Sequence, residues 1–197
     1  MSDHRSRTTG ASGVLAALTA VLLSASATAA APETQLAAWT PKELRFTYQG
    51  FTTRYSCDGL RDKVRSALLE LGARKDLTVQ ETACSARSGG PERFPGVIIR
   101  MQVLTPLSAN AAAPDAAAVA AHWKALDLRL DRDAVSDSGN CELLEQIKQS
   151  ILPLFSTRNI EYNSTCVPHQ LSAAGTRLRV DVLVSDAPDQ KPAAAAH

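Results

Sequence analysis

Apolar and polar residues follow two different periods in the first half of the chain. Over residues 44–51 apolar side chains alternate with polar ones, which is typical of a β-strand with one buried face. Over residues 60–71 they recur at steps of three and four, which predicts an amphipathic helix. Ser56 is a suitable N-cap for this helix, and Gly72 is suited to end it. Two strands are expected to follow, over residues 77–84 and 97–104.

The second half shows the same order of patterns. Residues 126–130 alternate strictly and predict a strand. A helix follows, with Asn140 as its expected N-cap and Pro153 as the residue that ends or kinks it. Two more strands are expected over residues 160–166 and 177–184.

The two halves align from their first tryptophan through the helix, without a gap, at an offset of 84 positions. The offset then falls to 82 at the second cysteine and 79 in the last strand. Shared residues in one order favour a duplicated unit, whereas two unrelated α+β stretches with ordinary apolar patterning are the alternative. The main aligned pairs are Trp39 with Trp123, Cys57 with Cys141, and Cys84 with Cys166.

The sequence therefore predicts an α+β protein with two β-α-β-β units in tandem, over residues 30–106 and 123–185. An alanine-rich linker over residues 107–122 joins them, and residues 186–197 form a disordered tail. Two arrangements are open: separate modules, or one six-stranded mixed sheet with both helices on one face. The single sheet is favoured because it covers apolar surface that each small unit would expose.

The first 29 residues have the pattern of a secretory signal peptide. Arg5 and Arg7 precede an uncharged apolar stretch over residues 14–23, and small residues at 27–29 suit a cleavage site. A membrane span would need about 20 apolar residues, so a retained anchor is the weaker alternative. We expect a periplasmic or secreted protein, and the alanine- and arginine-rich composition suggests a bacterial one.

The charge balance excludes two classes of partner. The chain has 21 basic and 20 acidic residues, and removal of the signal peptide leaves equal numbers of each. A nucleic-acid-binding protein would carry a clustered basic excess, and attachment to anionic lipid needs similar clusters. We therefore expect no nucleic-acid partner and no membrane span after signal cleavage.

Four cysteines in an exported chain predict disulfides. The repeat selects one of the three pairings, in which Cys57 bonds to Cys84 and Cys141 to Cys166. Each bridge ties the start of a helix to the end of the following strand, and closing such a loop contributes about 3–4 kcal/mol. A redox-active cysteine or a zinc site is disfavoured, because the chain has no C-x-x-C pair and no regular histidine spacing.

The motifs of common catalytic sites are missing. His122 and His169 belong to no recognisable nucleophile–base arrangement, and the sequence has no phosphate-binding glycine loop. We therefore expect no catalytic residue, no metal site and no cofactor.

Differences between the units are better candidates for function than their shared scaffold. Only the first unit has the long loop over residues 85–96 and an aromatic segment before its helix. Arginine and aromatic residues are enriched at interface hot spots, although a solvent loop with Phe94 turned inward is the plainer interpretation. The candidate binding surface consists of Arg54, Tyr55, Arg87, Arg93 and Phe94.

These patterns favour an exported, disulfide-stabilised, non-catalytic binding or scaffold protein of the bacterial envelope, with another envelope protein as partner. The alternatives are a small periplasmic enzyme with its site between the repeats, and a carrier of a small apolar ligand. The sequence identifies neither the partner nor the oligomeric state.

Overall fold

The chain divides into two units, Met1–Ala31 and Pro32–His197, and the structure, a computed structural model, describes residues of the second only. The predicted signal peptide, Arg87, Cys166 and residues 187–197 therefore lie outside the described residues. The described ranges are residues 33–51, 53–85, 90–108, 118–130, 137–164 and 176–186.

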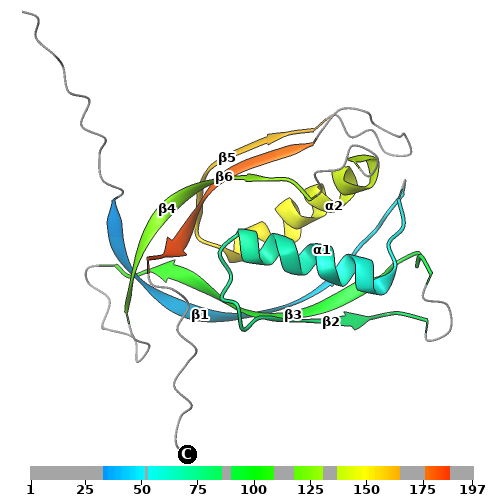
Figure 1. Ribbon diagram of the computed structural model, residues 1–197, viewed down its shortest axis with the longest axis horizontal. Coiled ribbons are helices and arrows are strands. Elements are labelled where there is room, and N and C mark those ends of the chain that lie inside the picture. The colour runs from blue at the N-terminus through cyan, green and yellow to red at the C-terminus, as the bar shows by residue number, and fades with distance from the viewer. Residues whose placement is uncertain are drawn as a thin grey trace, which may run out of the picture. The chain divides into compact units, whose positions relative to one another are not determined.

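Strands and helices follow one another in the order strand, helix, strand, strand, and this order occurs twice (Figure 1). It agrees with the order predicted from the hydrophobic pattern. The elements are β1 (Thr34–Thr47), α1 (Cys57–Glu70), β2 (Thr78–Thr82), β3 (Gly96–Pro106), β4 (Val119–Leu128), α2 (Asp137–Ser150), the 3-10 turn η1 (Leu152–Leu154), β5 (Thr157–Asn163) and β6 (Arg177–Ser185).

The six strands form one sheet in the order β2-β3-β1-β4-β6-β5. Every neighbouring pair is antiparallel, so the prediction of a mixed sheet is wrong. The reason lies in the third strand of each half. β3 pairs with both β1 and β2, and β6 pairs with both β4 and β5, so the two strands that flank a helix never become neighbours.

The halves are joined where β1 pairs with β4, over residues 34–37 and 119–122. β1 begins ten positions before the predicted strand, and β4 begins inside the range that the sequence assigned to the linker. Ala37 and Ala121 are fully buried at this junction. Alanine carries little alternation signal, so the hydrophobic pattern did not reveal this part of either strand.

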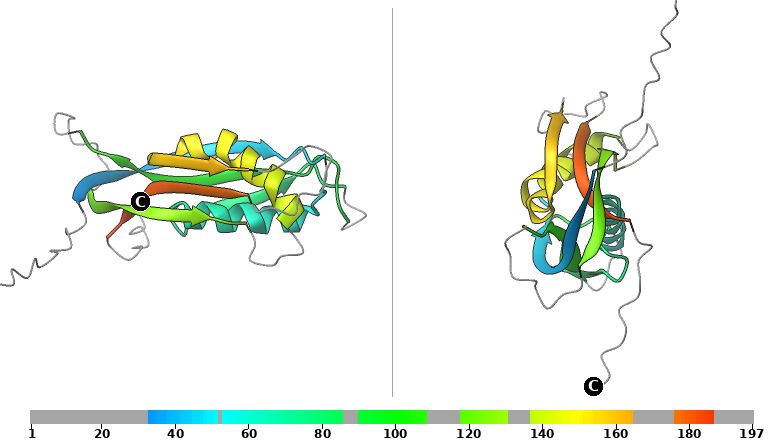
Figure 2. Two further views of the ribbon diagram at one scale, coloured as in Figure 1. Left: turned by 90° about the horizontal axis from the view of Figure 1, so that it is seen from above. Right: turned by 90° about the vertical axis from the view of Figure 1, so that its left-hand side faces the viewer.

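Both helices pack on the same face of the sheet, as predicted. Buried residues of α1, of α2 and of strands from both halves belong to one apolar core. In Figures 1 and 2, β4, β6 and β5 lie on one side of the two helices and β1, β3 and β2 on the other. A smaller cluster on the opposite face contains Leu104 and Leu183, with Trp39 and Trp123 packed against it.

α1 begins and ends as the sequence predicts. The Ser56 side chain accepts a hydrogen bond from the Gly59 N–H at 3.3 Å, which satisfies one free donor of the first turn. At the other end Gly72 has a φ of +91°, a conformation that favours glycine. The N–H groups of Gly72 and Ala73 donate to carbonyls of the last helical turn, which completes a Schellman motif.

α2 begins three residues before Asn140, so the prediction of Asn140 as N-cap is wrong. Its side-chain oxygen accepts a hydrogen bond from the Tyr55 hydroxyl instead, at 3.0 Å. The tertiary contact thus takes the acceptor that a cap would have used. At its other end α2 stops at Ser150, and Pro153 lies in η1, where a proline in the first turn loses no helical hydrogen bond.

Candidate functional site

The segment between β1 and α1 packs against the first turns of α2. The Tyr48 hydroxyl lies 3.1 Å from Glu142 Oε2 and 3.1 Å from the Thr53 carbonyl oxygen. The Phe51 N–H donates to the same Glu142 oxygen at 2.9 Å. A nearly buried carboxylate of the second half therefore holds a loop of the first half in place.

Tyr55 supports this loop from inside. Its ring meets the Tyr48 ring edge-on, with 4.9 Å between ring centroids, and its hydroxyl reaches Asn140. Only 8% of Tyr55 is exposed. Tyr55 thus positions the loop, and it does not present its ring to solvent as a surface contact residue would.

Burial, aided by the neighbouring Tyr55 and by the Glu142 carboxylate, raises the pKa of Tyr48 far above its ordinary value of 10. The phenol therefore keeps its proton at neutral pH and serves as a hydrogen-bond donor.

The predicted binding residues that the structure describes meet at this end of the fold. The Glu92 N–H donates to the Tyr55 carbonyl, and the Tyr48 N–H donates to the Pro95 carbonyl, each at 2.9 Å. These two bonds place the loop before β3 beside the loop before α1.

Two phenylalanines and two arginines of these loops are exposed. Phe94 is 51% exposed, with the Arg93 guanidinium 5.4 Å from its ring centroid, and Phe51 is 64% exposed. Arg54 is also exposed, whereas Arg87 lies outside the described residues. The plainer interpretation, in which Phe94 turns inward, is therefore wrong. We call the set of Phe51, Arg54, Arg93 and Phe94 the tip.

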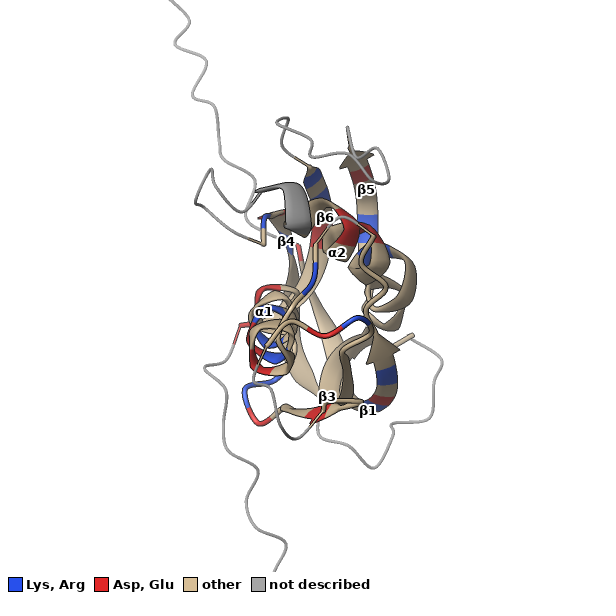
Figure 3. Cartoon of the chain, turned by 90° about the vertical axis from the view of Figure 1, so that its right-hand side faces the viewer, with Lys and Arg blue, Asp and Glu red and all other residues tan. Residues whose placement is uncertain are grey.

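A groove of about 360 Å³ runs between the end of β1 and α2. Gln146 bridges it: its Oε1 accepts from the Gln49 N–H and its Nε2 donates to the Gln49 carbonyl, both at 2.9 Å. Figure 3 looks onto this end of the fold and shows acidic positions on α2. Other lining residues include Thr47 and Phe51 from the first half, and Glu142, Glu145 and Gln149 from α2.

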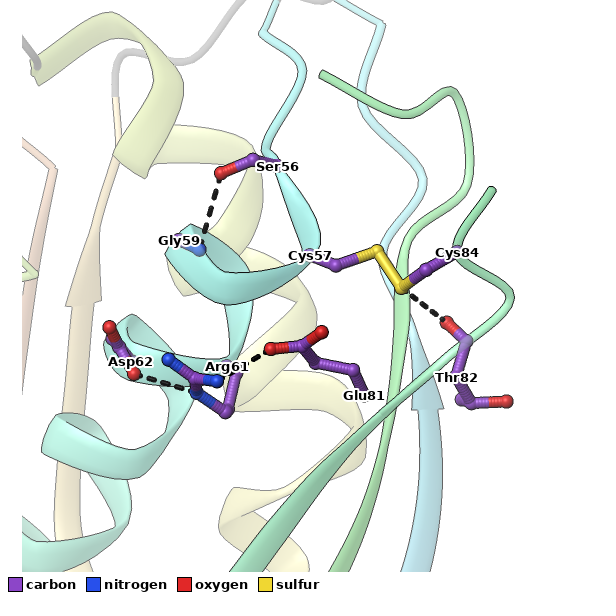
Figure 4. A network of polar contacts seen from close by, with 8 residues as sticks. All are labelled: Ser56, Cys57, Gly59, Arg61, Asp62, Glu81, Thr82 and Cys84. Atoms are coloured by element: carbon purple, nitrogen blue, oxygen red, sulfur yellow. Dashed lines mark hydrogen bonds and ion pairs between the residues drawn. A yellow bond between two sulfur atoms is a disulfide. The ribbon is translucent and has the colours of Figure 1, made fainter. Parts of the chain in front are cut away.

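The predicted bridge between Cys57 and Cys84 is confirmed, with their Cα atoms 6.2 Å apart. It links the first residue of α1 to the turn after β2 (Figure 4). The ion pair between Arg61 and Glu81, at 2.6 Å, joins the same two elements. Cys141 is also disulfide-bonded, but its predicted partner, Cys166, lies outside the described residues.

Two further features are absent from the described ranges. There, no three histidine, cysteine, aspartate or glutamate side chains gather so that they could hold a metal ion. Among the same residues, no helix has the length and apolar character needed to cross a membrane.

Sequence reasoning missed the residues of α2 that hold the loop. Asn140 was expected to cap α2, and this expectation hid the role of its side chain as a tertiary partner. One signal was available: Glu142 and Gln146 are four residues apart and therefore share a helix face beside the apolar one. Comparison with family models, curated proteins and solved structures found no match to this chain.

Proposed function

We propose that this chain is an exported, non-catalytic binding protein whose contact surface is the tip. The observation that carries the proposal is the exposure of two phenylalanines beside two arginines on adjoining loops. Such residues dominate the binding energy of many interfaces. The Cys57–Cys84 bridge is compatible with export, because disulfides persist in oxidising compartments.

The buried contacts behind the tip support a binding role. Hydrogen bonds and ring packing hold the backbone of the loop, and they come from Tyr48, Tyr55, Asn140 and Glu142. A surface that is already ordered loses less entropy on binding than a mobile one. The hydrogen-bonded residues thus lie beneath the tip, and the exposed residues of the tip are suited to contact a partner.

The chemistry of the groove favours binding over catalysis. The enzyme alternative placed a site between the halves, where the groove lies. The raised pKa of Tyr48 makes it a poor base at neutral pH, and Glu142 accepts hydrogen bonds that fix the loop. Carboxylates and amides in the lining also suit an apolar cargo poorly.

We also infer that the two halves are copies of one unit, and the strand register supports this. β3 places Leu104 opposite Trp39, and β6 places Leu183 opposite Trp123. These pairs are related by the offsets of 84 and 79 found in the sequence. Two unrelated α+β stretches would have no reason to share this register.

A cation–aromatic contact follows the same offset. The Arg74 guanidinium lies 5.7 Å from the ring centroid of Trp39, and the Arg158 guanidinium lies 4.6 Å from that of Trp123. Both members of the second pair are 84 positions after those of the first. A duplication explains why the contact occurs twice.

Photo-crosslinking in the producing cell tests the tip. A photoreactive residue replaces Phe94, and the control replaces Leu36, which is 59% exposed near the start of β1. We expect a discrete protein adduct at position 94 and none at position 36. The Arg93→Ala and Phe51→Ala variants should weaken the adduct. Equal adducts at both positions, or none at any tip position, would refute the assignment.

Peptide mapping of the exported protein tests the compartment and the duplication together. We expect a mature chain that begins near residue 30, with Cys57 joined to Cys84 and Cys141 joined to Cys166. A bridge between the halves, or reduced cysteines in native material, is the contrary result.

A further inference from the structure

In the part of the chain that the structure describes, the edge of β1 that faces β4 is unpaired along most of its length. β1 pairs with β3 over residues 37–47, but it pairs with β4 only over residues 34–37. Among the described residues, no strand pairs with this edge beyond Ala37. An unpaired strand edge is a template for another extended chain.

The direction of the backbone groups follows from two hydrogen bonds. The Leu36 carbonyl accepts a hydrogen bond from the Leu107 N–H, and the Tyr48 N–H donates to the Pro95 carbonyl. The backbone N–H and C=O groups of even-numbered residues of β1 therefore point toward β3. The register is continuous between these bonds. Since the direction alternates along an antiparallel strand, the N–H and C=O groups of Glu43, Arg45 and Thr47 point to the open edge.

Two features limit where a chain can pair. Gln146 occupies the next position, because its amide donates to and accepts from the Gln49 backbone as a neighbouring strand would. Pro41, on the same edge, has no N–H to offer. The free stretch therefore runs from Glu43 to Thr47, beside the groove between β1 and α2.

The groove defines the charge of the occupant. Within the described ranges, its lining contains the carboxylates of Glu142 and Glu145 and no lysine, arginine or histidine. Arg45, the cation next along the strand, lies two residues before Thr47 and is not part of the lining. Phe51 supplies an exposed apolar surface at the end of the groove.

We propose that an extended segment of a partner protein adds as a strand to β1 beside α2, with a lysine or arginine side chain in the groove. Main-chain hydrogen bonds to Arg45 and Thr47 would hold the segment, and Glu145 with Glu142 would select the basic residue. This proposal rests on the proposed binding function and names the mode of binding and the chemistry of the ligand.

Nuclear magnetic resonance titration with synthetic peptides tests the proposal. The probe is a blocked peptide of about eight residues, a usual strand length, that alternates valine and threonine around one lysine. One comparison peptide has glutamate in place of the lysine, and another has N-methyl groups on alternate backbone nitrogens. We expect the lysine peptide to shift the amide signals of Arg45 and Thr47. The glutamate peptide should bind about tenfold more weakly, and the N-methylated peptide should not bind.

Variants separate the backbone contribution from the side chains. Arg45→Pro removes the N–H at the open edge without removing a bond to β3, and should abolish the shift of the Thr47 amide signal. The matched variant Arg45→Ala keeps the N–H and should bind like the wild type. Glu145→Gln should remove most of the preference for lysine over glutamate. If Arg45→Pro fails to fold, the N-methylated peptide gives the same information.

Several results would overturn the proposal. They are no shift at Arg45 or Thr47 with the lysine peptide at about 1 mM, equal binding of the N-methylated peptide, and shifts confined to the tip. Slow hydrogen exchange of both amides before any peptide is added would assign the edge to this chain or a second copy. Crosslinking at Phe94 does not involve the β1 edge, so its outcome tests the binding function separately.

Discussion

The fold leaves little room for a side chain at Gly72. Its φ of +91° strains any other L-residue, and an added Cβ would lie 3.1 Å from the Leu183 carbonyl oxygen. We expect Gly72→Ala to lower the free energy of unfolding by about 1–3 kcal/mol. Gly72→Asn should cost less, because asparagine tolerates this conformation. Urea unfolding measures both, and an unchanged midpoint for Gly72→Ala would contradict the conformational account.

Tyr48 makes the stability sensitive to alkaline pH. Its pKa is raised in the folded state, so the unfolded chain loses this proton first, near pH 10, and stability falls as pH rises above that value. The loss is up to about 1.4 kcal/mol per pH unit. Tyr48→Phe should reduce this slope between pH 10 and 11.5, measured by urea unfolding.

Tyr162 is the control for this titration. Burial also raises the pKa of its phenol, so Tyr162→Phe should remove its own part of the slope and leave the part that Tyr48 contributes. Tyr48→Phe should further cost about 1–3 kcal/mol at pH 7, because Glu142 loses a donor. If the unfolding free energy of wild type and of Tyr48→Phe had the same slope against pH, the Tyr48 hydroxyl would titrate normally.

Among the elements, α1 and β2 are joined by a covalent link. β2 has five residues and, among the described strands, pairs with β3 alone, and the Cys57–Cys84 bridge and the Arg61–Glu81 ion pair tie it to the helix. We expect the double variant Cys57→Ala, Cys84→Ala to lose about 3–4 kcal/mol. Arg61→Ala should lose much less, because its ion pair is exposed. Thermal unfolding that shows equal losses would assign the stability to local contacts and not to the bridge.

The sequence predicted elements that have clear apolar periods and local caps. α1 is the best case, because Ser56, four buried residues on one face and Gly72 all act within the helix or next to it. Prediction from the sequence failed where a contact with a residue far along the chain determines the local structure. Asn140 meets Tyr55 instead of capping α2, and Ala121 of β4 is buried where β4 pairs with β1. The antiparallel pairing of the strands likewise depends on β3. No local sequence pattern indicates that β3 lies between two other strands.

The two arginine–tryptophan contacts test whether the halves are equivalent elements. A double-mutant cycle with Arg74→Ala and Trp39→Leu, and another with Arg158→Ala and Trp123→Leu, isolates each contact from other effects of the substitutions. We expect coupling energies of about 0.5–1 kcal/mol in both cycles, from urea unfolding. A coupling energy in one half alone would mean that the two contacts do not contribute equally to stability, although the same sequence offset relates them.

At the scale of the whole described fold, the halves share one core although their strands group separately. Buried residues of both helices and of β1, β3, β4 and β6 form a single apolar cluster. α2 holds the loop after β1 through Glu142, while Gly72 at the end of α1 lies against β6. Each helix thus contacts the other half, which explains why one sheet forms in place of two modules.

This exchange of contacts predicts that neither half folds alone. A fragment of residues 30–106 or 107–185 exposes the apolar surface that its partner covers, and a unit of this size has little core to spare. We expect each fragment, with its disulfide formed, to show no cooperative thermal transition by circular dichroism. An equimolar mixture should regain the transition of the intact chain, as β1 pairs with β4 and α2 returns to the loop before α1. A cooperative transition in either fragment alone would show independent modules, and the shared core would then be a contact between them and not a condition for folding.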